Sequence, residues 1–191
     1  MIVLLIGMPA TGKTSVVKEI LSENPDWQVK KYKKLRFTIS KLIKTVVFGV
    51  YPAYPTKIFL GTDMLTMDIS RDAQSFLRKL REEHPDYSVL IEGDRFTNQP
   101  FLSFLRDKGY DFSVLELQVE EKEYKRRQFA RNNMQSEQFI KRCETKIKNL
   151  RESFSVETFP NNDWDDSAAL VKEVKKRLNI KTTVLRKNED H

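Results

Sequence analysis

Gly7, Gly12, Lys13 and Thr14 have the types and spacing of a loop that binds phosphate. The loop follows an apolar run at 2–6 and precedes a helical pattern at 13–22, which is the context such a loop requires. Glycines let the backbone turn its N–H groups toward a phosphate, and the dipole of the next helix adds positive potential at the same point. A glycine turn without a ligand is the alternative, and the strand and helix on either side disfavour it. We therefore predict a site for a nucleoside triphosphate.

The chemistry of this motif assigns a role to each polar residue in it. Lys13 is expected to reach the β and γ phosphates of ATP as a catalytic residue, and the Thr14 hydroxyl to ligate Mg²⁺. The residues expected to contact the nucleotide in this loop are Gly7, Ala10, Thr11, Gly12, Lys13, Thr14 and Ser15.

Acidic residues that serve phosphoryl transfer are expected at two further places. Glu92 and Asp94 follow the apolar run 89–91 in the stretch 92-EGDR-95, the usual position of a second carboxylate near magnesium. We predict both as metal ligands and Asp94 also as a catalytic residue, with loop capping as the alternative. Arg95 either holds a substrate phosphate or pairs with one of these acids. Asp63 either caps the following helix or faces the acceptor, and we favour the acceptor as a catalytic role.

Basic residues gather on two predicted helices that flank the polar turn 132–137. Residues 125–127, 131, 141 and 142 are all Lys or Arg. Such helices either close as a lid that excludes water from the triphosphate or present a solvated face. We favour the lid at about 121–150, with Arg126 and Arg131 binding the nucleotide and Arg127 catalytic.

Strands and helices alternate along the chain. Strands are predicted at 2–6, 46–51, 88–92, 112–119 and 154–159; helices are predicted at 13–22, 70–83, 98–108, 121–131, 136–153 and 165–178. This order predicts an α/β fold of three layers, with a mostly parallel five-stranded sheet and helices on both faces. Ligands of such sheets bind at the carboxyl ends of the strands, where the phosphate loop lies. We predict one domain over 1–180 and a polar tail over 181–191.

The composition suggests a polyanionic partner. The formal net charge is +7, and seven Lys or Arg residues and no acid lie between positions 30 and 44. That segment either lies against phosphates or is a solvated face. The single Cys143 cannot form an intramolecular disulfide, and no apolar run approaches the roughly 20 residues of a membrane span. We expect a cytoplasmic protein with no membrane partner; the sequence leaves its oligomeric state open.

These motifs together resemble the P-loop kinases of the nucleoside and nucleotide kinase group over roughly residues 1–178. A narrower resemblance to the phage 5-hydroxymethyluracil DNA kinases is carried by 61-GTDMLTMDI-69, 91-IEGDRFTN-98 and 135-QSEQFIKRCETKIKNL-150. It implies ATP and Mg²⁺ at the loop, Asp63 near the acceptor and Arg126, Arg127 and Arg131 on phosphates. The host cytoplasm is then the expected location. Where many small-molecule kinases carry the base after the second strand, this chain offers lysines and arginines.

Four activities remain open. The favoured one is transfer of the γ-phosphate to the hydroxymethyl group of 5-hydroxymethyluracil in phage DNA. The alternatives are a deoxynucleoside monophosphate kinase, a polynucleotide 5′-hydroxyl kinase and a nucleotide-dependent DNA-binding module that transfers phosphate only to water. The acceptor is therefore DNA or a free nucleotide.

Overall fold

The described part of the chain covers most of its length. A computed structural model describes residues 1–191 except 25, 52–60, 64, 67, 131–134 and 181–191. Arg131 and the predicted tail 181–191 lie outside the described residues.

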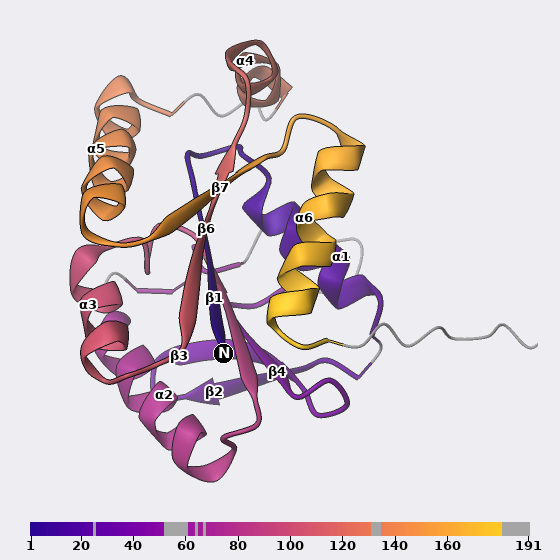
Figure 1. The fold of residues 1–191 in the computed structure, drawn as a ribbon, viewed down its shortest axis with the longest axis vertical. Helices are drawn as coiled ribbons and strands as arrows, with labels where there is room; N and C mark the ends of the chain where they lie inside the picture. Colours follow the sequence, from indigo (N-terminus) through magenta and orange to yellow (C-terminus); the bar gives the residue numbers. More distant parts are fainter. Residues whose placement is uncertain (25, 52–60, 64, 67, 131–134, 181–191) are drawn as a thin grey trace, which may run out of the picture.

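One sheet runs through the molecule (Figure 1). Its strands are β1 (Ile2–Ile6), β2 (Gln28–Tyr32), β3 (Leu35–Ser40), β4 (Thr45–Phe48), β5 (Ser88–Glu92), β6 (Phe112–Gln118) and β7 (Val156–Pro160). Their order is β2-β3-β4-β5-β1-β6-β7. The five strands from β4 to β7 in this order are parallel, while β2 and β3 form an antiparallel hairpin at the edge.

The expected α/β fold is confirmed, and the expected strand number is wrong. The described sheet has seven strands rather than five, because the lysine-rich segment after α1 folds as the β2–β3 hairpin. In β3, Leu35 and Phe37 are buried and Arg36 between them is exposed. This alternation is the two-residue period of a strand with one face on the core. The run of lysines obscured it.

Helices cover both faces of the sheet, as predicted. They are α1 (Lys13–Ser22), α2 (Ser70–Glu83), α3 (Gln99–Asp107), α4 (Glu121–Ala130), α5 (Glu137–Ser153) and α6 (Trp164–Arg177). The elements α2, α3 and α5 pack on one face around Phe76, Phe101 and Leu150, whereas α1 and α6 pack on the other face. The α4 helix has no buried residue and projects beyond the sheet (Figure 1).

Local sequence sets several helix ends. The Asn98 side chain accepts a hydrogen bond from the N–H of Phe101, as a helix cap does, and Gly109 takes a left-handed conformation just after α3. Asp163 caps α6 in the same way, two residues before the predicted start of that helix at 165. Predicted strand 46–51 is shorter in the structure, because Gly49 adopts φ 100° directly after β4.

The carboxyl ends of the parallel strands meet at one edge of the sheet. The segments that follow these ends are the phosphate loop after β1, Gly49 after β4, Gly93 after β5, α4 after β6 and Asn161 after β7. We call this the carboxyl edge. None of the helices within the described ranges has both the length and the apolar composition needed to cross a bilayer.

Candidate active site

The backbone of the phosphate loop has positive φ values at three positions, two of which are the motif glycines. Gly7 and Gly12 have φ values of 140° and 94°, and Ala10 also lies in the left-handed region at 66°. A Cβ atom on Gly7 would lie 2.6 Å from the carbonyl oxygen of Leu117, and one on Gly12 would overlap the side chain of Asn161. Both motif glycines are therefore required by conformation and by space.

Lys13 reaches back across the loop from the first turn of α1. Its Nζ donates to the carbonyl oxygens of Gly7 and Met8 at 2.9 and 2.7 Å. The ammonium group therefore lies within the turn of the loop, where a bound phosphate would receive its charge.

Glu92 and Thr14 form the part of the site that suits a divalent cation. The Thr14 hydroxyl donates to Oε2 of Glu92 at 3.5 Å, and the Tyr51 hydroxyl donates to Oε1 at 3.0 Å. Burial raises the pKa of Glu92, while the positive charge of Lys13 opposes that shift. Burial likewise raises the pKa of Tyr51 well above its ordinary value, with the Glu92 charge adding to it.

These donors fit Mg²⁺. A hydroxyl and a carboxylate are the hard oxygen ligands that this ion takes, and it keeps its other positions for water and substrate phosphates. No group of three His, Cys, Asp or Glu side chains in the described ranges is arranged to hold a metal by itself. Such an ion would therefore be held by Thr14, Glu92 and the nucleotide together.

Asp94 occupies a different position from Glu92, although the sequence predicts both as metal ligands. Lys146 on α5 donates to both carboxylate oxygens of Asp94, at 2.8 and 2.9 Å. Both side chains are about a third exposed or less. Asp94 thus joins α5 to the end of β5, and Glu92 alone lies beside Thr14.

Lys146 is a site residue that the sequence analysis missed. It lies on the α5 face that carries Phe139, Cys143 and Ile147 into the pocket, at spacings of three to four residues. Arg142, three residues after Phe139, shares this period, so the period alone does not single out Lys146.

A pocket opens between the phosphate loop, the end of β5 and α5. Its walls carry three carboxylates, Asp63, Glu92 and Asp94. The remaining lining residues are Gly7, Pro9, Ala10, Gly12, Lys13, Thr14, Gly93, Thr97, Gln135, Phe139, Cys143 and Ile147. The structure therefore brings predicted Asp63 into the same pocket as the loop.

Arg95 forms no ion pair with Glu92 or Asp94 in the described part of the chain, and its role on a substrate phosphate stays a prediction. Its Nε donates to the carbonyl oxygen of Leu65 at 3.0 Å, and its Nη2 to that of Asp63 at 3.4 Å. Arg95 thus holds the backbone of the segment that presents Asp63.

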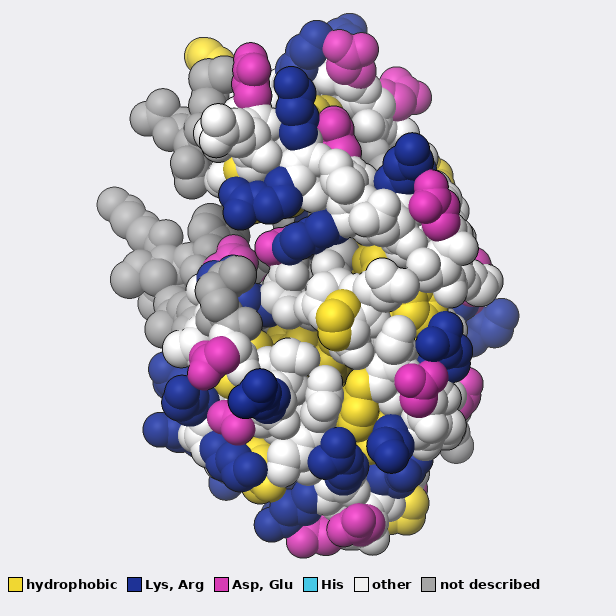
Figure 2. All heavy atoms as spheres, turned by 90° about the vertical axis from the view of Figure 1, so that its left-hand side faces the viewer, with side chains coloured by type: hydrophobic (Ala, Val, Ile, Leu, Met, Phe, Trp, Pro, Cys, Tyr) yellow, Lys and Arg dark blue, Asp and Glu magenta, His cyan; other side chains and the backbone are white. Residues whose placement is uncertain are grey.

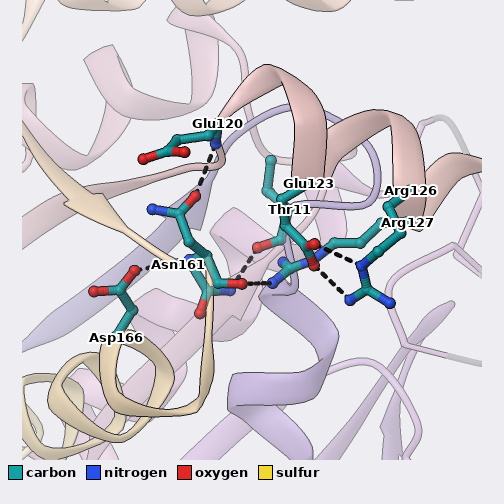
Figure 3. A network of polar contacts seen from close by, with 8 residues as sticks. Thr11, Glu120, Glu123, Arg126, Arg127, Asn161 and Asp166 are labelled. Atoms are coloured by element: carbon teal, nitrogen blue, oxygen red, sulfur yellow. Dashed lines mark hydrogen bonds and ion pairs between the residues drawn. The ribbon is translucent and has the colours of Figure 1, made fainter.

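The arginines of α4 divide into two kinds (Figure 3). Arg127 donates to Glu123 at 2.7 Å and to the carbonyl oxygen of Asn162 at 3.0 Å, and its guanidinium lies beside Gly12. Arg126 is exposed and pairs with Glu123. Hydrogen bonds from both arginines lower the pKa of Glu123 to about 2.

Of the two α4 arginines that the structure describes, Arg127 is therefore the one next to the phosphate loop. Figure 2, which views the α5 and α2 side, shows Lys and Arg side chains interspersed with acidic ones. The predicted lid over the triphosphate stays a prediction.

Asn161, just after β7, supports the loop from the side and was also missed by the sequence analysis. Its Nδ2 donates to the carbonyl oxygen of Thr11 at 2.6 Å, and the residue is buried (Figure 3). The polar run 161-NND-163 at a strand end was the available signal, because strand ends gather at the carboxyl edge.

The comparisons with known proteins show the fold. No protein-family model and no curated protein matches the chain. A solved structure of an unliganded sugar kinase from Janibacter sp. HTCC2649 is similar, with 14% identity, a TM-score of 0.53 and 94% coverage of each chain.

Two further similar structures have lower TM-scores. They are shikimate kinase from Aquifex aeolicus vf5 (14% identity, TM-score 0.47, 94% of this chain and 96% of that chain) and a gluconokinase from Sinorhizobium meliloti 1021 (12%, 0.43, 93% and 94%). The chain therefore shares the fold of that sugar kinase. The narrower resemblance to phage DNA kinases receives no support from these structures.

Proposed function

We propose that the protein is an ATP-dependent phosphotransferase that moves the γ-phosphate to a hydroxyl group. The observation that carries this proposal is the junction of the phosphate loop with β5. There Lys13 spans the loop and Thr14 lies 3.5 Å from the buried Glu92. A fold shared with kinases agrees with this arrangement.

The residues of the chain supply positioning and charge, which is most of what phosphoryl transfer needs. Lys13 and the loop backbone bind the β and γ phosphates. Thr14 and Glu92 would hold Mg²⁺, which would supply positive charge to the phosphate groups. Arg127, next to Gly12, neutralises charge from the α4 side.

The acceptor hydroxyl needs a carboxylate beside it. Asp63 and Asp94 both line the pocket, and both carboxylate oxygens of Asp94 accept hydrogen bonds from Lys146. We assign Asp94 as the group that receives the hydroxyl proton, because Lys146 fixes its direction, and Asp63 as the group that orients the acceptor.

The finer proposal concerns the acceptor itself. We propose the hydroxymethyl group of a base in DNA, supported by the resemblance of three segments and by the net charge of +7. A small-molecule hydroxyl is the alternative that the similarity to a sugar kinase favours.

The test is transfer from γ-labelled ATP with Mg²⁺. The acceptors are duplex DNA containing 5-hydroxymethyluracil, DNA with free 5′-hydroxyls, deoxynucleoside monophosphates, and neutral sugars. Label in any acceptor, absent from a Lys13→Ala variant, supports the phosphotransferase. Label in the modified duplex alone supports the finer proposal, and label only in a monophosphate or sugar refutes it. Phosphate released only to water contradicts the kinase assignment altogether.

A further inference from the structure

The β2–β3 hairpin presents exposed cations that the proposed reaction does not use. We call Lys30, Lys31, Lys33 and Arg36 the hairpin patch. All four are exposed, and β2 is an edge strand whose first four residues are exposed. Among the described residues, the Lys33 ammonium group makes a hydrogen bond to the Ser75 hydroxyl and lies over the ring of Tyr32, and both partners are neutral.

Two of these cations face each other across the hairpin. Lys31 and Arg36 are paired in the β2–β3 register, so their side chains leave the same face of the sheet. Like charges directly opposite each other destabilise a strand pair. No carboxylate forms an ion pair with either residue within the described ranges.

Lys31 and Arg36 have no ion-pair partner among the described residues. By contrast Lys34, at the hairpin turn, has its own partner in Asp68 at 3.1 Å. The sequence thus supplies an acid for the neighbour and leaves Lys31 and Arg36 facing one another.

The hairpin patch lies at the carboxyl edge. Because β3 is antiparallel to β4, its first residues pair with the end of β4, where Phe37 is opposite Phe48. The carbonyl of Arg36 accepts a hydrogen bond from the N–H of Gly49 at 3.0 Å, and Gly49 packs against Gly61. Gly61 in turn lies beside Glu92 of the candidate active site. A chain of backbone contacts therefore connects the patch with the pocket.

We propose that the hairpin patch binds the phosphodiester backbone of a nucleic acid strand. A bound polyanion would reduce the repulsion between Lys31 and Arg36, because its negative charge would lie beside two cations that have no ion-pair partner among the described residues. A row of cations along an edge β-strand suits the regularly spaced phosphates of a nucleic acid. Because the patch lies at the carboxyl edge, a nucleic acid bound across the hairpin could place one of its nucleotides in the pocket. This inference goes beyond the proposed phosphotransfer and is tested without ATP, so either can fail while the other stands.

The first experiment measures binding of the full chain to fluorescein-labelled 20-nucleotide probes by anisotropy between 50 and 300 mM salt, conditions chosen in the range where counterion release is strong. Single-stranded DNA, duplex DNA and single-stranded RNA distinguish the source of the backbone, and polyglutamate tests for any polyanion. Each lost phosphate contact lowers the slope of log K against log salt by about 0.7 to 0.9. The Lys31→Ala/Arg36→Ala variant is therefore expected to lose about 1.4 to 1.8 of that slope.

A matched control removes two exposed cations away from the hairpin. The Lys108→Ala/Lys172→Ala variant makes the same charge change at the end of α3 and on α6, and its slope is expected to equal that of the wild type. An equal loss of slope in both variants would show that net charge alone drives binding, and would overturn the proposal. So would the absence of wild-type binding at 50 mM salt, or binding of polyglutamate as strong as that of every nucleic acid.

A second variant separates binding from folding. Lys31→Glu places an acid opposite Arg36, so the hairpin gains an opposite-charge pair while the patch loses attraction for phosphate. We expect affinity for the best probe to fall at least fivefold at 100 mM salt while the melting temperature is unchanged or higher. Unchanged affinity refutes the proposal, and so does a loss of affinity that occurs only with a loss of folded structure.

Discussion

Removal of Lys146 is predicted to loosen α5 from the candidate active site. Lys146 makes two hydrogen bonds to Asp94, and the side chains are 32% and 28% exposed. Exposed ion pairs contribute about 0 to 1 kcal/mol, and breaking buried ones costs about 3 to 5 kcal/mol. A partly exposed, two-point pair lies between these limits, and we expect Lys146→Met to cost about 1.5 kcal/mol of unfolding free energy.

The assay is a double-mutant cycle in urea with Lys146→Met, Asp94→Asn and the two combined. The combined variant should lose little more than either single variant, with a coupling of about 1 kcal/mol. In a domain of this length Lys146→Met should lower the melting temperature by about 3 to 6 °C. Lys148→Met, at an exposed position of the same helix, is the control and should change stability by less than about 0.5 kcal/mol.

The same variants report on function. If Asp94 receives the acceptor proton and Lys146 directs it, Lys146→Met lowers kcat more than it raises KM for ATP, and Lys146→Arg restores part of kcat. A coupling of about zero in the cycle, with Lys146→Met no different from Lys148→Met, would refute the argument that this pair joins α5 to β5.

Three further predictions concern the loop, the buried acid and the hairpin turn. Gly12→Ala should abolish the stabilisation by MgATP and lower the free energy of unfolding by about 2 to 4 kcal/mol, because φ is 94° and the new Cβ overlaps Asn161. The control is Gly109→Ala, where φ is 64° and no atom lies within 4 Å of the new Cβ. It should lower the free energy of unfolding by only about 1 to 2 kcal/mol. Because burial raises the pKa of Glu92 above the ordinary 4.5, its contribution to stability is greatest at acidic pH and falls as pH rises through the folded-state pKa. The unfolding free energy of Glu92→Gln, relative to that of the wild type, should therefore increase as the pH rises from 4 to 8. The variant should also lose the stabilisation by MgATP. If urea melts show the same difference in unfolding free energy at every pH in this range, the reasoning is wrong. Lys33→Gly should raise stability by about 1 kcal/mol, because Lys33 has φ 51° in the hairpin turn, and a lowered midpoint in urea would count against it.

Local sequence was sufficient for the parts of the protein that depend on neighbours in the chain. The phosphate loop is recognisable because its glycines, lysine and threonine act within eight residues. Apolar periods and caps such as Asn98 place most helices to within a few residues. The sequence analysis did not predict the hairpin, because most of the residues at 30–36 are charged and this run obscured the alternation of apolar and polar positions at Leu35, Arg36 and Phe37.

The partners of the site residues were decided by the tertiary structure. Thr14 and Glu92 are 78 positions apart, Lys146 and Asp94 are 52 apart, and Asn161 and Thr11 are 150 apart. The sequence predicted both Glu92 and Asp94 as metal ligands. Gly93 between them has φ 94° and interrupts the strand, and the packing of α1 and α5 gives Glu92 a hydroxyl partner and Asp94 an ammonium partner. The sequence by itself predicted a phosphate-binding loop at a strand–helix turn, because that motif is local, and the structure has such a turn between β1 and α1. The partner of each acid and arginine depends on the order of the strands in the sheet, because that order brings distant strand ends to one edge.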